Sequence, residues 1–209
     1  MNKLVSILLF SVLPLLASAR TIGDFFVSET GNVFTLLEQS DRMDMVDYYE
    51  SGQKVNVSNV MDGKSSIDTL TTDFMKVKIA DAHEVAMRLY PEGKSDTLIV
   101  VIETFKVEVP DSKIRVFDTN WNELELKSVF KMPQMEDFLV KNLNKNQKKE
   151  ALAYVEFPLV KLEFAADGGI TATPTVLETL GKDEREKLKP CLLDSLHYRY
   201  AGNKFKLVK

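Results

Sequence analysis

Apolar and polar side chains alternate with a period of two through much of the segment 54–118. Met75, Val77 and Ile79, for example, are separated from one another by two lysines. Because successive side chains of a strand point to opposite faces, this pattern predicts strands with one buried and one solvated face, as in an antiparallel sheet. The run 98–102 is apolar at every position and predicts a central strand that is buried on both faces.

The turns between these segments predict how some of the strands pair. A three-residue loop at 81–83 places Val77 opposite Met87, so that apolar residues face each other across a hairpin. Near the C-terminus, a two-residue turn places Tyr200 opposite Phe205. Both registers keep the apolar side chains of the two strands on a shared face, as a half-buried sheet requires.

The segments outside the strands carry helical signals. Capping residues, apolar positions at helical spacing and breaking Gly or Pro residues predict helices over 32–39, 41–49, 133–143 and 182–189, whereas 145–149 is interpreted as a polar connector and 151–164 as a long strand. These elements predict an α+β fold: a predominantly antiparallel sheet with helices packed on one face. About 190 residues suit one domain, so we expect a single α+β domain over 20–209, with a sub-division, if there is one, near 131–150.

The first 19 residues have the pattern of a signal peptide. Lys3 gives the short N-terminal region its positive charge, and Leu4–Leu16 is an apolar run of 13 residues. At about 1.5 Å per residue, a helix of this length spans roughly 20 Å, which is less than the roughly 30 Å core of a bilayer. Ala17 and Ala19 are small residues at the positions that a signal peptidase reads, so we expect the mature chain to begin at Arg20. The alternative is an uncleaved anchor.

The rest of the chain predicts a protein that is exported and not lipid-anchored. No later apolar run approaches the length needed to cross a membrane, so we expect no span in the mature chain. A lipoprotein needs a cysteine just after the apolar run, and the single cysteine of the chain is Cys191. We therefore expect a periplasmic or extracellular location. Cys191 is interpreted as a small core residue rather than a nucleophile, because the sequence does not predict an electropositive niche around it.

The sequence predicts no catalytic, cofactor-binding or metal-binding residue. His83 is placed in a hairpin loop and His197 on the polar face of a strand, and neither belongs to a motif with metal-ligand spacing. Ser195 lies two residues before His197, but it lacks the flanking glycines of a nucleophile elbow. A pair of carboxylates that hydrolyses a glycosidic bond leaves no sequence motif, so this chemistry stays open.

Trp121, the single tryptophan, has two interpretations. It lies in the predicted turn Asp118–Asn122, where an exposed ring would be an anchor for a partner. Alternatively, the ring folds back over the end of the sheet. Trp121 is therefore the residue that we single out as a candidate partner contact.

Three hypotheses of function follow from these expectations. A net charge of −4 argues against a nucleic-acid partner. The first hypothesis is an exported, non-catalytic binding or assembly module that adds a partner strand to an open sheet edge, the ligand being an unknown protein, glycan or apolar ligand of the cell envelope. The second is a soluble periplasmic carrier of a lipid or other apolar ligand, and the third is a carboxylate-dependent hydrolase. The carrier would use adaptable methionine side chains as its lining: Met75, Met87, Met132 and Met135.

Four segments carry a resemblance to a known family: 42–49 (RMDMVDYY), 61–65 (MDGKS), 110–121 (PDSKIRVFDTNW) and 198–205 (YRYAGNKF). Together they resemble an uncharacterised family of exported Bacteroidales proteins, domain-of-unknown-function family 3256. The resemblance covers nearly all of the mature chain and implies an extracytoplasmic location. It implies no activity and no catalytic residue. The family's form of the last segment has tryptophan where this chain has Tyr200.

Overall fold

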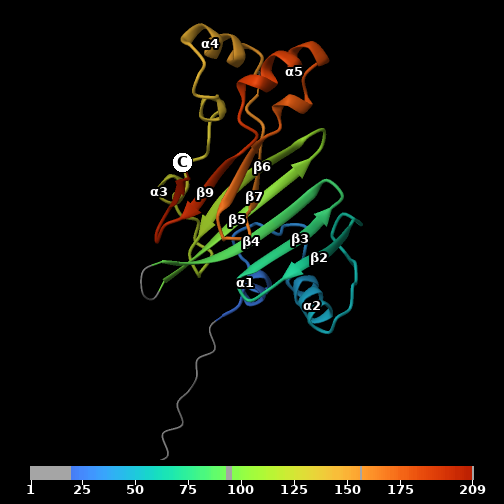
Figure 1. The fold of residues 1–209 in the computed structure, drawn as a ribbon. Helices are drawn as coiled ribbons and strands as arrows, with labels where there is room; N and C mark the ends of the chain where they lie inside the picture. Colours follow the sequence, from blue (N-terminus) through green and yellow to red (C-terminus); the bar gives the residue numbers. More distant parts are fainter. Residues whose placement is uncertain (1–19, 93–95, 156, 209) are drawn as a thin grey trace, which may run out of the picture.

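Two antiparallel sheets organise the chain (Figure 1). The computed structural model describes residues 20–92, 96–155 and 157–208, so the predicted signal peptide with Ala17 and Ala19 lies outside the described residues. The first sheet has six strands in chain order: β1 (Val57–Ser58), β2 (Lys64–Leu70), β3 (Phe74–Ala80), β4 (His83–Glu92), β5 (Asp96–Lys106) and β6 (Pro110–Phe117). The second has the order β10-β9-β8-β7, with β7 (Val160–Phe164), β8 (Ile170–Pro174), β9 (Leu196–Tyr200) and β10 (Phe205–Leu207).

Short helices connect and cover the strands. Two of them precede the first sheet, and the others lie between β6 and β9. The α-helices are α1 (Ile22–Val27), α2 (Gln39–Glu50), α3 (Leu126–Val129), α4 (Lys145–Ala153) and α5 (Lys182–Leu188). The 3₁₀ helices are η1 (Met135–Phe138), η2 (Val176–Glu178) and η3 (Lys189–Cys191).

The six-stranded sheet is buried on both faces along β5, as its apolar run predicts. On one face, Ile99 and Val101 pack in a core with α1, α2 and the loop between them. On the other face, Leu98, Val100 and Ile102 pack in a second core with the four-stranded sheet. Helices therefore cover one face, and the second sheet lies over β4, β5 and β6 on the other (Figure 1). This arrangement confirms the predicted α+β class with antiparallel sheets.

Side chains of β6 close the outer edge of β7. Asp111 Oδ1 accepts the backbone N–H of Val160 at 3.0 Å, and Ser112 Oγ accepts that of Leu162 at 3.0 Å. The Ser112 hydroxyl also shares a hydrogen bond of 2.9 Å with Thr104 Oγ1. An unpaired strand edge offers a row of free backbone groups, and these bonds satisfy two of them within the chain. They also join the two sheets.

Two side chains of β4 hold the turn between β7 and β8. Arg88 Nη1 donates to the carbonyl of Ala165 at 3.3 Å, and its guanidinium lies 4.8 Å from the ring centroid of Phe74. The hydroxyl of Tyr90 donates to the carbonyl of Gly168 at 2.6 Å. Burial raises the pKa of Tyr90, so its hydroxyl stays protonated and remains a donor. The second sheet is thus fixed to the first at both its edge and its turn.

The register of the β3–β4 hairpin differs from the prediction by two residues. Val77 lies opposite Val85 rather than Met87, because the turn is shorter and the ladder is irregular beside it. A shift of two residues keeps every side chain on its original face, so apolar alternation does not distinguish the two registers. The C-terminal hairpin has its predicted register, with Tyr200 opposite Phe205.

The segment interpreted as a polar connector forms helix α4, and the predicted strand over 151–164 begins only at Val160. The Asn144 side chain accepts the N–H of Gln147 at 3.0 Å, while the Gln147 side chain accepts the N–H of Asn144 at 2.9 Å. This capping box satisfies two backbone groups at the start of the helix and explains why a lysine-rich segment folds as one. 

Two other predicted helices are largely wrong. In place of a helix over 32–39, the Glu29 carboxylate accepts the N–H of Val33 at 3.0 Å, and Asn32 adopts a positive φ of 56°. These features produce a loop whose apolar side chains pack against the sheet. The helix predicted over 133–143 is limited to the single 3₁₀ turn η1. By contrast, the helix predicted at 182–189 is present as α5.

Candidate binding cleft

A cleft of about 690 Å³ is lined by residues of α5 and of the end of α4. Both helices lie at one end of the molecule (Figure 1). Four separate segments contribute to the cleft: the turn after β5, the end of α4 with the chain leading to β7, the segment after β8, and α5. This volume is within the roughly 300–1,000 Å³ range of small-ligand sites. The lining residues are Glu108, Ala153, Tyr154, Phe157, Leu159, Val176, Thr179, Leu180 and Glu184.

Hydrogen bonds of Thr175 fix the walls of the cleft. Its backbone N–H donates to the carbonyl of Leu159 at 3.0 Å, and its hydroxyl donates to the carbonyl of Pro110 at 2.7 Å. The starts of β6 and β7 and the end of β8 are therefore tied together at one point. Val176 follows directly and is 2% exposed, so it gives the cleft an anchored apolar floor.

Large apolar side chains are exposed beside this floor. Phe157 is 64% exposed and lines the cleft, and Val107, which is 84% exposed, precedes the lining residue Glu108. Exposing a phenylalanine to water costs free energy that burial of the same ring would recover, at about 25 cal/mol per Å² of apolar surface. Such side chains are the ones that a partner covers at an interface.

The charge of the cleft is negative. Glu108 and Glu184 are both exposed, and none of the described residues that line the cleft is Lys or Arg. Glu184 Oε2 accepts the N–H of Gly181 at 3.3 Å, which fixes one carboxylate at the first turn of α5. The cleft therefore combines an apolar floor with carboxylates, a combination that favours an apolar ligand with a positive charge.

A buried cluster of titratable side chains lies on the helix-covered face of β5, away from this cleft. Glu103 is 8% exposed, with Oε2 4.0 Å from Nε2 of His83 and Oε1 3.8 Å from Nη1 of Arg115. Burial raises the pKa of Glu103 and lowers that of His83. Arg115 makes its short bonds elsewhere, to Glu123 at 2.8 and 3.1 Å and to the carbonyl of Gly31 at 2.9 Å. Its guanidinium thereby ties the loop before α2 to β6.

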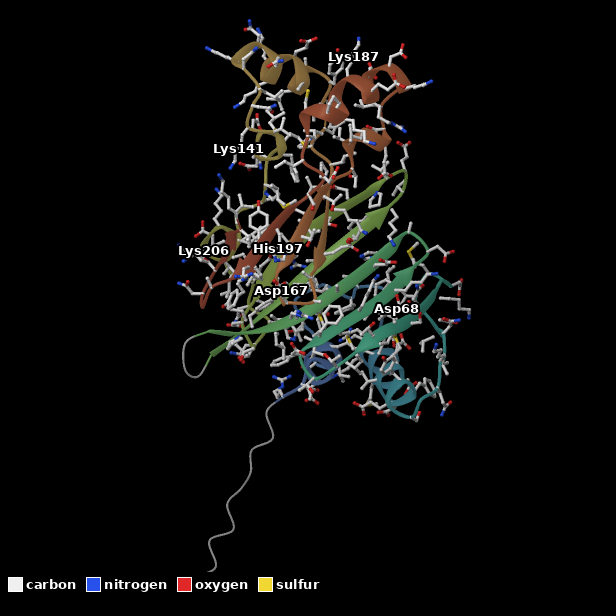
Figure 2. The ribbon with its side chains drawn as sticks, viewed as in Figure 1. Asp68, Lys141, Asp167, Lys187, His197 and Lys206 are labelled. Carbon is white, nitrogen blue, oxygen red and sulfur yellow. The ribbon has the colours of Figure 1, made fainter. Side chains whose placement is uncertain are left out.

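A second cluster joins the turn between β7 and β8 to β9 (Figure 2). His197 Nε2 lies 3.0 Å from Asp167 Oδ2, and His197 Nδ1 lies 3.4 Å from Thr171 Oγ1. The N–H of Gly169 and then His197 lower the pKa of Asp167. A Cβ atom at Gly169 would lie 2.8 Å from the His197 ring, so the imidazole packs directly on the turn. The hydroxyl partner of His197 is therefore Thr171 and not Ser195, which is exposed.

Trp121 is an internal residue. It adopts a positive φ of 63°, which is unusual for a large side chain, and its ring centroid lies 5.1 Å from that of Phe117. Only 6% of the residue is exposed. The backbone N–H of Trp121 donates to the carbonyl of Asp118, and Asp118 Oδ1 accepts the backbone N–H of Asn122, so the turn holds the ring over the sheet end. The partner contact stays a prediction, and it would require this ring to leave its site.

The other residues singled out from the sequence lie in the two cores. Met75 and Met87 are fully buried on the helix-covered face, whereas Met135 and Met132 pack in the core between the sheets. The four methionines therefore do not line one cavity, because the six-stranded sheet separates the two pairs. Cys191 is half-buried against the second of these cores, and its Sγ lies 3.6 Å from the carbonyl of Lys187.

Over 20–92, 96–155 and 157–208, no three or more His, Cys, Asp or Glu side chains are grouped so that they could hold a metal ion. Within the same ranges, no helix is both long and apolar enough to cross a membrane.

The cleft itself was missed by sequence reasoning. Its lining comes from segments that are up to 76 positions apart, from Glu108 to Glu184, and their proximity depends on how the second sheet packs on the first. Phe157 lies in the segment that was interpreted as a long strand over 151–164, so the sequence did not show that Phe157 and Val107 are both exposed. Isolated apolar residues of this kind are candidates for an interface.

Comparison with known proteins places the chain in a family. No curated protein matches the sequence. A solved structure from Porphyromonas gingivalis W83, described as a domain of an uncharacterized protein, has a TM-score of 0.81 and 20% sequence identity, covering 91% of this chain and 98% of that chain. At this identity the similarity shows a shared fold. Residues 15–205 match the family described as protein of unknown function (DUF3256), and the chain therefore belongs to that family, as the sequence resemblance predicted.

Proposed function

We propose that the protein is an exported, non-catalytic binding module whose cleft receives an apolar, positively charged segment of another protein of the cell envelope. The observation that carries this proposal is the exposed Phe157 beside a cleft of about 690 Å³ with an anchored apolar floor. A partner side chain that fills the cleft would bury Phe157 and Val107 at the same time. Glu108 and Glu184 would pair with Lys or Arg residues next to that side chain.

A protein segment fits the cleft better than a lipid does. A fatty acid or phospholipid carries a negative headgroup, which the carboxylates of Glu108 and Glu184 would repel. In addition, the methionines proposed as a carrier lining are divided between two cores. The carrier thus has less support than a binding module.

Strand addition at a sheet edge, the mode first considered, is disfavoured at several edges. Asp111 and Ser112 occupy backbone groups on the edge of β7. The edge of β6 is partly covered because the N–H of Leu124 donates to the carbonyl of Val116 at 2.8 Å. β1 is only two residues long. Short, covered or side-chain-capped edges are the devices by which proteins prevent strand addition, so we assign binding to the cleft instead.

The proposed absence of catalysis is supported by the contacts of the histidines. His197 bonds to Asp167 and Thr171, but the hydroxyl is at the outer limit of hydrogen-bond distance, and the ring packs on a turn rather than facing the cleft. His83 stacks on Phe105 with ring centroids 4.4 Å apart and is buried beside Glu103. Both imidazoles therefore have a structural role that requires no substrate.

Export is supported by the sequence of residues 1–19 and is tested separately. Sequencing the N-terminus of the protein isolated from its own cells should give Arg20 as the first residue. A protein that begins at Met1 in the cytosol would contradict export, whatever the cleft binds.

The binding proposal is tested by changing the exposed apolar residue. We expect Phe157→Asp to abolish co-purification of a specific protein from the cell envelope, while the melting temperature stays within about 2 °C, because a surface substitution changes stability by about 0.5 kcal/mol or less. Met43, which is 51% exposed on α2, offers the control substitution Met43→Asp. Equal recovery of the same proteins by Phe157→Asp and by the unchanged protein would refute the proposal.

A further inference from the structure

A second groove, of about 450 Å³, lies between α2 and strand β2 of the six-stranded sheet. One wall is the C-terminal half of α2, another is the chain 53–56, and the third is β2, which carries Asp68 at the right-hand edge of the sheet in Figure 2. The lining residues are Met45, Tyr48, Tyr49, Gln53, Lys54, Val55, Asn56, Ser66, Ile67 and Asp68. They share no residue with the cleft beside α5.

The local sequence explains why the groove is open. Gly52, with a positive φ of 76°, ends α2, and the N–H of Gln53 donates to the carbonyl of Tyr48 at 2.8 Å. The chain then approaches β2, but β1 pairs with it only at Ser65 and Lys64. Beyond these residues, β2 pairs with β3 on one edge, while its other edge has no partner strand among the described residues and borders the groove.

An irregularity in β2 lies at the same place. The pairing of β2 with β3 shifts between Ile67 and Thr69, which leaves Asp68 as an extra residue. A bulge of this kind changes the direction of a side chain and interrupts the regular ladder of an edge strand. The groove is thus poorly suited to a strand that would pair along β2, which disfavours an extended peptide.

Tyrosines provide the apolar surface of the groove. Tyr48 is 37% exposed and Tyr49 is half-buried, while Met45, at 3% exposed, lies beneath them in the core. A tyrosine ring offers a rigid apolar face together with a hydroxyl that both donates and accepts hydrogen bonds. In the described ranges of the chain, neither of the two hydroxyls makes a hydrogen bond to the protein.

Polar side chains complete the opposite side. Lys54, Asn56 and Asp68 supply an ammonium donor, an amide that donates and accepts, and a carboxylate acceptor. The side chains of Lys54 and Asn56 make no hydrogen bond within the part of the chain that the structure describes, so their groups are available to a ligand. One positive and one negative charge balance, which favours a neutral ligand.

We infer that this groove is a binding site for a neutral carbohydrate. A sugar ring has apolar C–H faces, which stack on tyrosine rings, and hydroxyl groups around its rim, which need the mixed donors and acceptors that Asn56, Lys54 and Asp68 provide. The volume is within the range of small-ligand sites. This inference is independent of the proposed protein-binding cleft.

The test uses the full chain as processed by the cell and an array of neutral oligosaccharides, followed by calorimetric titration with the glycan that gives the strongest array signal. We expect specific binding that Tyr48→Ala and Asn56→Ala each weaken about tenfold or more, a change of about 1.4 kcal/mol in binding free energy. Met43→Ala on the same helix is the matched control and should leave the affinity unchanged. Because Tyr48, Asn56 and Met43 are all exposed, each variant should keep the melting temperature of the unchanged protein.

The two proposals fail separately. Phe157→Asp should retain full carbohydrate affinity, and Tyr48→Ala should retain the protein partner. Absence of binding across the array, or binding that both groove variants leave unchanged, would overturn the carbohydrate site. Binding of an acidic glycan alone, or displacement of the sugar by a peptide that occupies the groove, would also overturn the assignment to neutral carbohydrate.

Discussion

Removing the hydroxyl that joins the two sheets should destabilise the protein by a measurable amount. Ser112 is 6% exposed, and its hydroxyl accepts the N–H of Leu162, which is 1% exposed, and shares a bond with Thr104. Ser112→Ala loses both bonds and leaves a buried N–H without a partner. With about 1 kcal/mol for each bond, the expected loss of unfolding free energy is about 2 kcal/mol. For a chain of this length, that corresponds to a fall of about 4–8 °C in melting temperature.

The assay combines thermal unfolding with amide hydrogen exchange. In Ser112→Ala, the amide of Leu162 should exchange faster, whereas the amide of Lys161 should change less, because its N–H does not point to Ser112. Ser128 provides the matched control: it is exposed and its hydroxyl donates to the nearby carbonyl of Glu125, so Ser128→Ala should cost about 0.5 kcal/mol or less. A Ser112→Ala variant with an unchanged melting temperature and unchanged exchange at Leu162 would refute this account of how the sheets are joined.

Three further predictions concern buried groups. Burial raises the pKa of Glu103 above its ordinary value of 4.5, so its charged form costs stability as pH rises above that value. In urea unfolding, Glu103→Gln should therefore gain stability relative to the unchanged protein as the pH rises from 4 to 7. A gain that shrinks over this range would contradict the assignment. Gly169→Ala places a Cβ against the carbonyl of Tyr198 and should cost about 1–3 kcal/mol by thermal unfolding, whereas a neutral effect would show that the turn moves freely. Trp121, at 6% exposed, should emit at short wavelength and resist iodide quenching until the protein unfolds, and quenching of the native protein would place its ring at the surface.

Local patterns were sufficient to predict much of the six-stranded sheet. Alternation identified which side chains face each core, and the apolar run of β5 indicated burial on both faces. The two-residue turn correctly set Tyr200 opposite Phe205. The Val77 register was wrong because two registers that differ by two residues satisfy the same alternation, so only the turn geometry decides between them.

The division into two sheets could not be predicted in this way. It depends on side-chain bonds between distant residues, such as those from Asp111 to Val160 and from Tyr90 to Gly168. Neither bond has a signature in the surrounding sequence. Helix α4 was different, because Asn144 and Gln147 form a recognisable capping box that the lysine-rich composition obscured.

The candidate sites were harder to predict from the sequence than the fold was. The cleft requires Tyr154, just after α4, to lie near Leu180, just before α5, and the groove depends on the end of α2 meeting the irregular part of β2. Trp121, the residue singled out beforehand, proved to be internal, because its turn holds the backbone in a left-handed conformation. Exposed Phe157 and Tyr48 became informative only when their surroundings were known.

Site-specific photo-cross-linking tests the central claim most directly. A photoreactive phenylalanine analogue at position 157 in living cells should form an adduct with one specific envelope protein, whereas the same analogue at position 43, also exposed but far along the chain on α2, should not. Absence of an adduct at 157, or the same adducts at both positions, would contradict the assignment of the cleft as the surface that binds a partner.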